Sequence, residues 1–518
     1  MSLLSSTLLL FGAWIIWRVW RFTLSPLIRP NDPKELPYTI PFIGHAISLF
    51  SNSTVVLTKG WRNLSGGDRQ PFALQAAGTS LHVISHPKHM AEVFKNTQNF
   101  SFQGFVLDIL KATGISPGAI AKTYDLDPAI VDSKVDHFNY PKKDKHFEHL
   151  NRQLHLTQLS PSSQNDNLAS LDQSILSWLQ DHLTIQNLQQ YSLAQDSLEV
   201  NLYSFINNVF IQAGEHAYFG PALSKLHPNV AKNFQIYDEL YWKDLYQLPP
   251  FLAPALTSIK EKLITQFKDY FSLPREERTA QNPSWFTPNL ELTLDALGVE
   301  PRDKAVFFLM LYFAANSNTP KLLFWLLAHL LSSPPSYLSQ IRSETSPAFT
   351  NQNLTDTTYI LKPGNCPTLE RFYLEVLRFR SNSISARRVT TDTVLPAPGS
   401  FVLRKGAKVM IPWRVFHFDE TVFGEDAKVF NPERWEHLPA SARGSVRPFG
   451  GGKSICPGRY LAEREVKKAV ALLVRRFDFE VLAEGDGWMP VGDDSRPGVG
   501  MMAVEKGGDS RVRIRGRE

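Results

Sequence analysis

One short segment constrains this 518-residue chain more than any other: Phe449-Gly-Gly-Gly-Lys-Ser-Ile-Cys456-Pro-Gly-Arg459. Three consecutive glycines allow the backbone to approach a flat ligand closely, because glycine has no Cβ. Cys456 comes directly before an amphipathic segment, and Pro457 is suited to the first position of a helix. The helix dipole and the unpaired N–H groups at such an N-terminus stabilise a thiolate. The segment therefore predicts a thiolate metal ligand, and the alternative is a buried free cysteine.

Composition excludes several other classes of protein. Charged residues make up 20% of the chain and hydrophobic residues 43%, so the chain can bury a large core and wholesale disorder is excluded. The two cysteines, Cys366 and Cys456, cannot form a disulfide framework or a four-thiolate metal site. A net charge of +5 over this length is weak evidence for a polyanionic partner, and we expect no nucleic-acid partner.

The N-terminus has the composition of a membrane anchor. Residues 3–17 carry no charge, and with Val19 and Trp20 the apolar run reaches the roughly 17–25 residues that cross a bilayer. Arginines follow the run and none precede it, which predicts a cytoplasmic location for the rest of the chain. A cleaved signal peptide, the alternative, has its basic residues before the apolar run. We therefore expect residues 1–22 to form a single-pass transmembrane anchor.

The segment after the anchor is predicted to be a proline-rich spacer that covers residues 23–44. Four prolines close together make it stiff and non-helical; they are Pro30, Pro33, Pro37 and Pro41. No linker or repeat interrupts residues 45–518, so we expect one large catalytic domain there. Four N-x-S/T sequons are treated as chance matches, because the predicted orientation places them in the cytoplasm; they begin at Asn52, Asn63, Asn99 and Asn353.

Periodicity predicts a mainly helical body with a small β region. Residues 72–85 have the pattern of two strands joined by a Gly-Thr turn, and a helix is expected to begin at His86-Pro87. The longest apolar run, 301–331, carries polar residues and Pro320 at its centre, which favours a helix through a globular core over a second membrane span. Because Pro320 has no N–H, this helix is expected to kink or open beside Thr319.

Several motifs, in order along the chain, resemble those of the cytochrome P450 family. The family's haem-binding signature F-x-x-G-x-x-x-C-x-G is matched by four residues: Phe449, Gly452, Cys456 and Gly458. Glu375 and Arg378 match its E-x-x-R pair, and the segment 432–435, Pro-Glu-Arg-Trp, resembles its P-E-R-F/W segment. Asn318-Thr319 stands where the family usually has an acid followed by threonine. The Asn-Thr pair is similar to that of the sterol hydroxylase and prostacyclin synthase branch, and the C-terminal segment is similar to fungal relatives.

The resemblance implies a mainly α cytochrome P450 fold with a small β region, preceded by the transmembrane helix. It implies haem b, with the Cys456 thiolate as the iron ligand and with Phe449, Gly452 and Gly458 around it. Arg388 matches the position that commonly holds a haem propionate, and Arg387 is the runner-up. Asn318 and Thr319 are the implied catalytic residues. Glu375, Arg378 and Arg434 are expected to have a structural role.

Two departures from the family pattern concern haem binding. The family usually has Arg or His two residues before the ligand cysteine, whereas this chain has Ser454. Its usual W-x-x-x-R is absent from residues 131–165. Propionate binding therefore depends partly on residues that the sequence does not identify.

The resemblance implies a monooxygenase that oxidises a lipophilic small molecule, such as a sterol, a terpenoid or another secondary metabolite. NADPH-cytochrome P450 reductase is the expected electron donor, and the endoplasmic reticulum membrane is the expected location. A basic cluster is either a reductase-docking face or an ordinary solvated face; it comprises Lys453, Arg459, Arg464, Lys467 and Lys468. Because position 318 lacks the acid, the alternative is a haem-thiolate isomerase or dehydratase that needs no reductase. A non-enzymatic haem protein is less compatible with the long apolar helix.

Overall fold

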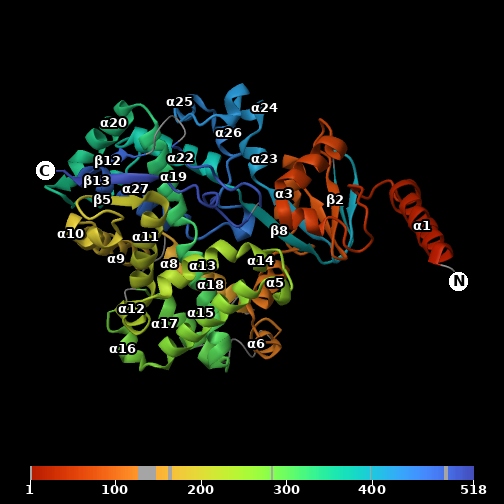
Figure 1. Cartoon of the computed structure of the whole chain (residues 1–518), viewed down its shortest axis with the longest axis horizontal. Helices are drawn as coiled ribbons and strands as arrows, with labels where there is room; N and C mark the ends of the chain where they lie inside the picture. The colour runs from red at the N-terminus through yellow and green to blue at the C-terminus, as the bar shows by residue number, and fades with distance from the viewer. Residues whose placement is uncertain are drawn as a thin grey trace.

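The chain begins with a helix that projects from the rest of the protein in the computed structural model (Figure 1). α1 (Leu3–Val19) continues through a π-helical turn (Trp20–Leu24) into α2 (Ser25–Ile28). The 23 residues Ser6–Ile28 are long and apolar enough to cross a membrane, and no part of their most apolar stretch is buried. The helix therefore ends at Ile28, beyond the boundary predicted at residue 22, and it includes the first part of the predicted spacer.

The structure describes residues 3–125, 147–161, 166–281, 284–396, 398–482, 488–496 and 498–517. A β-rich lobe lies next to the projecting helix, and a larger helical body follows it (Figure 1). The main helices of the lobe and body are α3 (Ala46–Gly60), α4 (Pro87–Lys95), α5 (Gln103–Thr113), α8 (Phe147–Leu159), α9 (Asn167–His182), α11 (Leu202–Phe219), α13 (Val230–Leu240), α15 (Pro254–Ser272), α17 (Phe286–Ala296), α18 (Pro301–Asn316), α19 (Thr319–Ser332), α20 (Pro335–Thr345), α22 (Pro367–Arg380) and α27 (Arg459–Arg476).

The lobe is built on a six-stranded mixed sheet with the strand order β1-β2-β3-β11-β8-β4. Its strands are β1 (Lys34–Glu35), β2 (Phe72–Ala76), β3 (Thr79–Val83), β4 (Phe100–Ser101), β8 (Ile384–Val389) and β11 (Lys408–Pro412). The predicted strand pair at residues 72–85 is confirmed, since β2 and β3 pair antiparallel, and α4 begins at Pro87 as expected. A second sheet joins β5 (Leu198–Asn201), β13 (Arg511–Gly516) and β12 (Phe477–Val481) at the far end of the body.

Four helices form the centre of the body: α9, α11, α19 and α27 pack against one another around the main hydrophobic core. α19 is buried on all sides from Pro320 to Leu330, which is the pattern of a core helix rather than of a surface helix. Among the described residues, only the N-terminal helix qualifies as a membrane span. The interpretation of 301–331 as a helix through a globular core is therefore confirmed.

The long apolar segment is two helices, α18 and α19, separated at Ser317 and Asn318. Pro320 lies in the first turn of α19, so the carbonyl of Asn316 has no N–H partner at that position. Regular hydrogen bonds resume on both sides, from Ser317 N–H to Phe313 O (3.0 Å) and from Leu322 N–H to Asn318 O (3.0 Å). The predicted opening beside Thr319 is confirmed.

Candidate haem-thiolate site

The glycine loop before α27 has a backbone that only glycine adopts easily at two positions. Gly450 has φ +75° and Gly452 has φ +64°, both in the left-handed region. A Cβ on Gly452 would also lie 3.1 Å from the side chain of Phe94 on α4. The loop is closed by the Cys456 N–H, which donates to the carbonyl of Phe449 (3.0 Å). The loop therefore holds its backbone against neighbouring groups with no side chain between them.

The Cys456 sulfur lies one turn before α27. Pro457 and Gly458 form a turn and the helix begins at Arg459, so the prediction that Pro457 is its first residue was wrong. The later start of the helix has a local cause: the backbone N–H groups of Gly458 and Arg459 donate hydrogen bonds to the Cys456 sulfur. Burial raises the pKa of the Cys456 thiol, while these N–H groups and the Arg459 charge oppose that rise. The residue as a whole is exposed at the surface of the loop. The site thus stabilises a thiolate once a cation binds it.

Strand β8 presents Arg387, not Arg388, to this loop. The Arg387 guanidinium is buried and donates to the hydroxyl of Ser454, two residues before Cys456. Arg388 points away, because successive side chains of a strand alternate between faces, and it forms an ion pair with Asp108 (2.8 Å). Of the two arginines, the runner-up Arg387 is therefore the one that contacts the loop.

A second arginine contacts the loop from α8. Arg152 Nε donates to the carbonyl of Lys453 (3.0 Å). No motif predicted this contact, since the W-x-x-x-R pattern is absent from residues 131–165. Part of that window, 131–146 and 162–165, lies outside the described residues. Arg152 is thus a residue of the site that the motif search missed.

The donor set fits haem. Arg387 is buried between the rings of Phe94 and Phe102, and none of the described carboxylates lies within ion-pair distance of it. A buried cation without an anion is costly, and burial lowers the pKa of Arg387 to about 10. An anionic ligand at this position would remove that cost. A flat dianionic group with an iron atom would pair with the charge of Arg387, lie against the glycine loop and accept the Cys456 sulfur as a metal ligand.

Comparison with known proteins identifies the family, since the cytochrome P450 profile matches residues 35–503. The chain belongs to the cytochrome P450 family. Cytochrome P450 monooxygenase poxD of Penicillium oxalicum is 24% identical over 475 residues, which cover 90% of this chain and 91% of that protein. The 7-alpha-hydroxycholest-4-en-3-one 12-alpha-hydroxylase of Homo sapiens is 26% identical over 533 residues, covering 97% of each. The chain is therefore an oxidoreductase of the monooxygenase class, and the family implies a haem-thiolate cofactor.

A solved structure confirms the predicted P450 fold. Retinoic acid-bound cyanobacterial CYP120A1 superposes with a TM-score of 0.67 over 94% of this chain and 99% of that one, at 18% identity. Both the mainly α class and the small β region agree with the prediction.

The two predicted catalytic residues of this P450 have different surroundings. Asn318 accepts the N–H of Met501 (2.9 Å) through Oδ1 and donates Nδ2 to the carbonyl of Val499 (3.5 Å). Its amide therefore ties the helix opening to the C-terminal segment. The Thr319 hydroxyl instead forms a hydrogen bond with the carboxyl of Glu465 on α27, a residue that no motif had singled out.

The E-x-x-R pair is the centre of a fully buried network. Arg378 donates to both oxygens of Glu375 (2.9 and 2.7 Å), and neither side chain is exposed. Arg434 donates to the same carboxylate (3.1 Å), as expected, and so does Trp435 Nε1 (2.9 Å), which sequence reasoning missed. Arg378 also binds the carbonyls of His417 and Ala427, in the segment that leads to the glycine loop. The network joins α22 to that segment.

The basic cluster is not a continuous exposed face. Lys467 is buried and paired with Glu370 and Glu463, and Lys468 is buried and paired with Asp172 (2.5 Å). Both lysines point inward because α27 is a core helix. Of the predicted cluster, Lys453 is exposed, and Arg459 and Arg464 are partly exposed.

Proposed function

We propose that this P450 is a single-pass membrane protein that oxidises a lipophilic small molecule with O2 and electrons from NADPH-cytochrome P450 reductase. The substrate class is a sterol, a terpenoid or another secondary metabolite. The membrane is that of the endoplasmic reticulum, with the catalytic domain in the cytoplasm. The family generally takes electrons from a redox partner and binds lipophilic substrates, which supports this assignment.

The observation that carries the proposal is the position of the Cys456 sulfur beside the glycine loop, where it accepts hydrogen bonds from two backbone N–H groups. In haem b, Cys456 would ligate the iron, and Arg387 would hold a propionate. The left-handed backbone at Gly452 and the turn at Gly458 keep side chains away from the ring and the sulfur. A Cβ at Gly458 would lie 3.6 Å from the sulfur, so a larger side chain there would crowd it. Thiolate-ligated haem supplies reductive activation of dioxygen when it is bound.

Relatives and the anchor support the substrate class and the location. Several relatives carry names that state the oxidation of sterols, such as the cholesterol 7-alpha-monooxygenase of Cricetulus griseus, 26% identical over 65% of this chain. The exposed apolar helix Ser6–Ile28 supports insertion in the bilayer, from which an apolar substrate would be drawn.

A carbon monoxide difference spectrum of full-length protein tests the ligand. Cys456→His should abolish the red-shifted Soret band of the carbon monoxide complex, because that band requires a thiolate ligand on the haem iron. Cys366→Ala is the matched control: Cys366 is buried at the start of α22, where its thiol lies 3.6 Å from the carbonyl of Glu344. The control should keep the band. If Cys456→His keeps it, Cys456 is not the ligand.

A second experiment separates the monooxygenase from the isomerase. Purified protein is screened against a sterol and terpenoid panel by substrate-difference spectroscopy, and the compound with the largest spin-state shift is carried into turnover assays. Product formation should require both NADPH and the reductase. Full conversion without them would establish the isomerase instead.

A further inference from the structure

The N-terminal helix is held against the catalytic domain along part of its length. After Ile28 the chain turns, and residues 34–39 run back beside the helix. Three polar contacts join the two segments: Arg21 Nη2 to Glu35 Oε2 (2.7 Å), Arg18 Nη1 to Tyr38 O (2.7 Å) and Trp14 Nε1 to Thr39 O (2.7 Å). The ring of Tyr38 also packs on the rings of Trp17 and Phe22, with centroids 5.5 and 5.2 Å apart. The partner numbers rise as the helix numbers fall, so the returning segment is antiparallel to the helix.

The returning segment belongs to the β-rich lobe and is not a loose linker. Glu35 lies in β1, which pairs with β2 in the six-stranded sheet. The N–H of Leu36 donates to the carbonyl of Ala73 (2.9 Å), and the Leu36 side chain is buried in the core of the lobe. The helix from Trp14 to Ile28 is therefore fastened to the edge of a folded sheet.

This part of the helix has two different faces. The side chains that face the domain recur every three or four residues and are partly buried: Trp14, Trp17, Arg18, Arg21, Phe22 and Ser25. The opposite face is mainly apolar, and its large side chains are 42–74% exposed: Ile15, Ile16, Val19, Trp20, Leu24 and Leu27. Both arginines thus lie on the side of the protein, and apolar groups cover the side away from it.

The contacts limit how the helix can enter a bilayer. If residues 14–28 crossed the hydrocarbon, residues 34–39 would have to enter it beside them, and so would the exposed side chain of Lys34. Charged side chains and unpaired backbone groups are costly at that depth. A helix that lies along the membrane surface avoids this cost and places its apolar face in lipid. Tryptophans favour the membrane interface, and three occur in this stretch: Trp14, Trp17 and Trp20.

We propose that residues 14–28 form an interfacial arm, which lies in the plane of the cytoplasmic leaflet with its exposed face among the acyl chains and the catalytic domain above it. Lipid is the occupant of that face, because the arm continues the apolar helix that enters the membrane in the proposed function. This inference rests on that membrane location, and it leaves any crossing of the bilayer to residues before Trp14. Because the arm is fastened to β1, it holds the catalytic domain at one tilt against the membrane.

Electron paramagnetic resonance of the full-length haem protein in phosphatidylcholine–phosphatidylserine nanodiscs tests the arm. Single spin labels are placed at Val19→Cys, Thr23→Cys and Leu27→Cys, which share the exposed face. The background is Cys366→Ala, so that Cys456, the proposed iron ligand, is the remaining native cysteine. Accessibility to O2 and to a water-soluble nickel chelate gives the depth of each label. An arm in the membrane plane gives the same shallow depth at all three positions.

A crossing helix gives a different result. Its labels at the first and last of these positions would differ in depth by about 12 Å, because eight residues separate them at a rise of about 1.5 Å each. Such a gradient would overturn the proposal, and so would labels that all lie in water. Spin–spin broadening that disappears on dilution with unlabelled protein would overturn it as well, since a second copy of the chain would then cover the face.

Ser25→Cys is the matched control, because Ser25 lies between the labelled positions in sequence but on the face toward the domain. Its label should have much lower access to O2 than the labels at positions 23 and 27. Equal access on both faces would show that lipid surrounds the helix, and it would contradict an arm that is covered by the domain.

The single-pass topology of the proposed function is tested separately. Protease protection of an N-terminal tag in sealed microsomes shows whether residues before Trp14 cross the bilayer. A tag that is digested from the cytoplasmic side would overturn the single-pass topology, whereas equal depths of the three labels would still establish the arm.

Discussion

At the scale of single residues, Glu375 shows how much one buried carboxylate holds in place. Its two oxygens accept hydrogen bonds from Arg378, Arg434 and Trp435, and from the N–H of Asn431 (2.9 Å). Removal of one partner of such a network leaves charges buried and unpaired, at a cost of about 3–5 kcal/mol. That is a large part of the roughly 5–15 kcal/mol by which a domain is stable.

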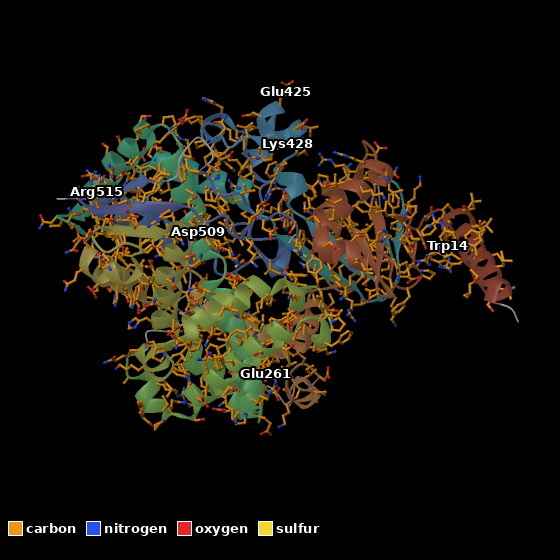
Figure 2. All side chains as sticks on the ribbon, viewed as in Figure 1. Trp14, Glu261, Glu425, Lys428, Asp509 and Arg515 are labelled. Carbon is orange, nitrogen blue, oxygen red and sulfur yellow. The ribbon has the colours of Figure 1, made fainter. Side chains whose placement is uncertain are left out.

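Glu375→Ala should therefore abolish haem incorporation rather than slow turnover, as measured by haem content and thermal unfolding. Glu420→Ala is the matched control: its partner Lys428 extends from the surface (Figure 2), and such an exposed pair contributes only about 0–1 kcal/mol. A Glu375→Ala protein with full haem content and normal stability, but a lower rate, would contradict a structural role.

The neighbouring arginines of β8 offer a second comparison of matched residues. Arg387→Ala should lower haem affinity at least about tenfold, because it removes the buried cation beside Ser454, whereas Arg388→Ala removes only a partly exposed pair with Asp108. Haem transfer to apomyoglobin measures the difference. Faster haem loss from Arg388→Ala than from Arg387→Ala would restore the assignment made from the sequence.

At the scale of helices and strands, patterns within one element were predictable and contacts between elements were not. The opening beside Thr319 follows from Pro320 alone, because a missing N–H acts on its own helix. Arg387 and Arg388 are adjacent, so the choice between them depends on the register of β8 against β11, which a motif does not contain. Glu465 and Arg152 were missed for the same reason: their partners lie on other elements.

The contact between α11 and α18 leads to a prediction about how the stability of the protein depends on pH. Burial raises the pKa of Glu215 from 4.5 to about 7, although the Tyr312 hydroxyl donates to it (2.6 Å) and opposes the rise. The pKa of Glu215 is higher in the folded protein than in the unfolded chain. The contribution of Glu215 to the free energy of unfolding is therefore complete below pH 4.5 and is lost as the pH rises to 7. The loss amounts to about 3 kcal/mol.

Chemical denaturation of the wild type and Glu215→Gln across this pH range measures the effect. The stability of the wild type relative to the variant should fall as the pH rises and level off above pH 7. A constant difference at all pH values would show that Glu215 titrates alike in the folded and unfolded chains.

At the scale of the whole molecule, the anchor and the β-rich lobe form one side of the protein (Figure 1). The anchor is tied to the chain that follows it, since Trp14, on the projecting helix (Figure 2), donates to the carbonyl of Thr39 (2.7 Å) and Arg21 pairs with Glu35 (2.7 Å). Phe42, which follows these contacts, is 70% exposed and Ile47 on α3 is 61% exposed. This side of the protein therefore presents apolar groups beyond the anchor itself.

A chain that starts at Arg29 should keep its haem and become extractable by alkaline carbonate, because it lacks the membrane-spanning candidate Ser6–Ile28. It should still bind lipid vesicles weakly through the exposed apolar residues near the lobe. A chain that starts at Thr23 is the informative control, since it keeps the last helical turns up to Ile28 but too few residues to span a bilayer. Both truncated chains should be released by carbonate, whereas the full chain should stay in the membrane pellet. If the chain from Arg29 resists carbonate extraction, a second membrane span must exist. The segment to test would then be α18 with α19, and that result would contradict their burial in the core.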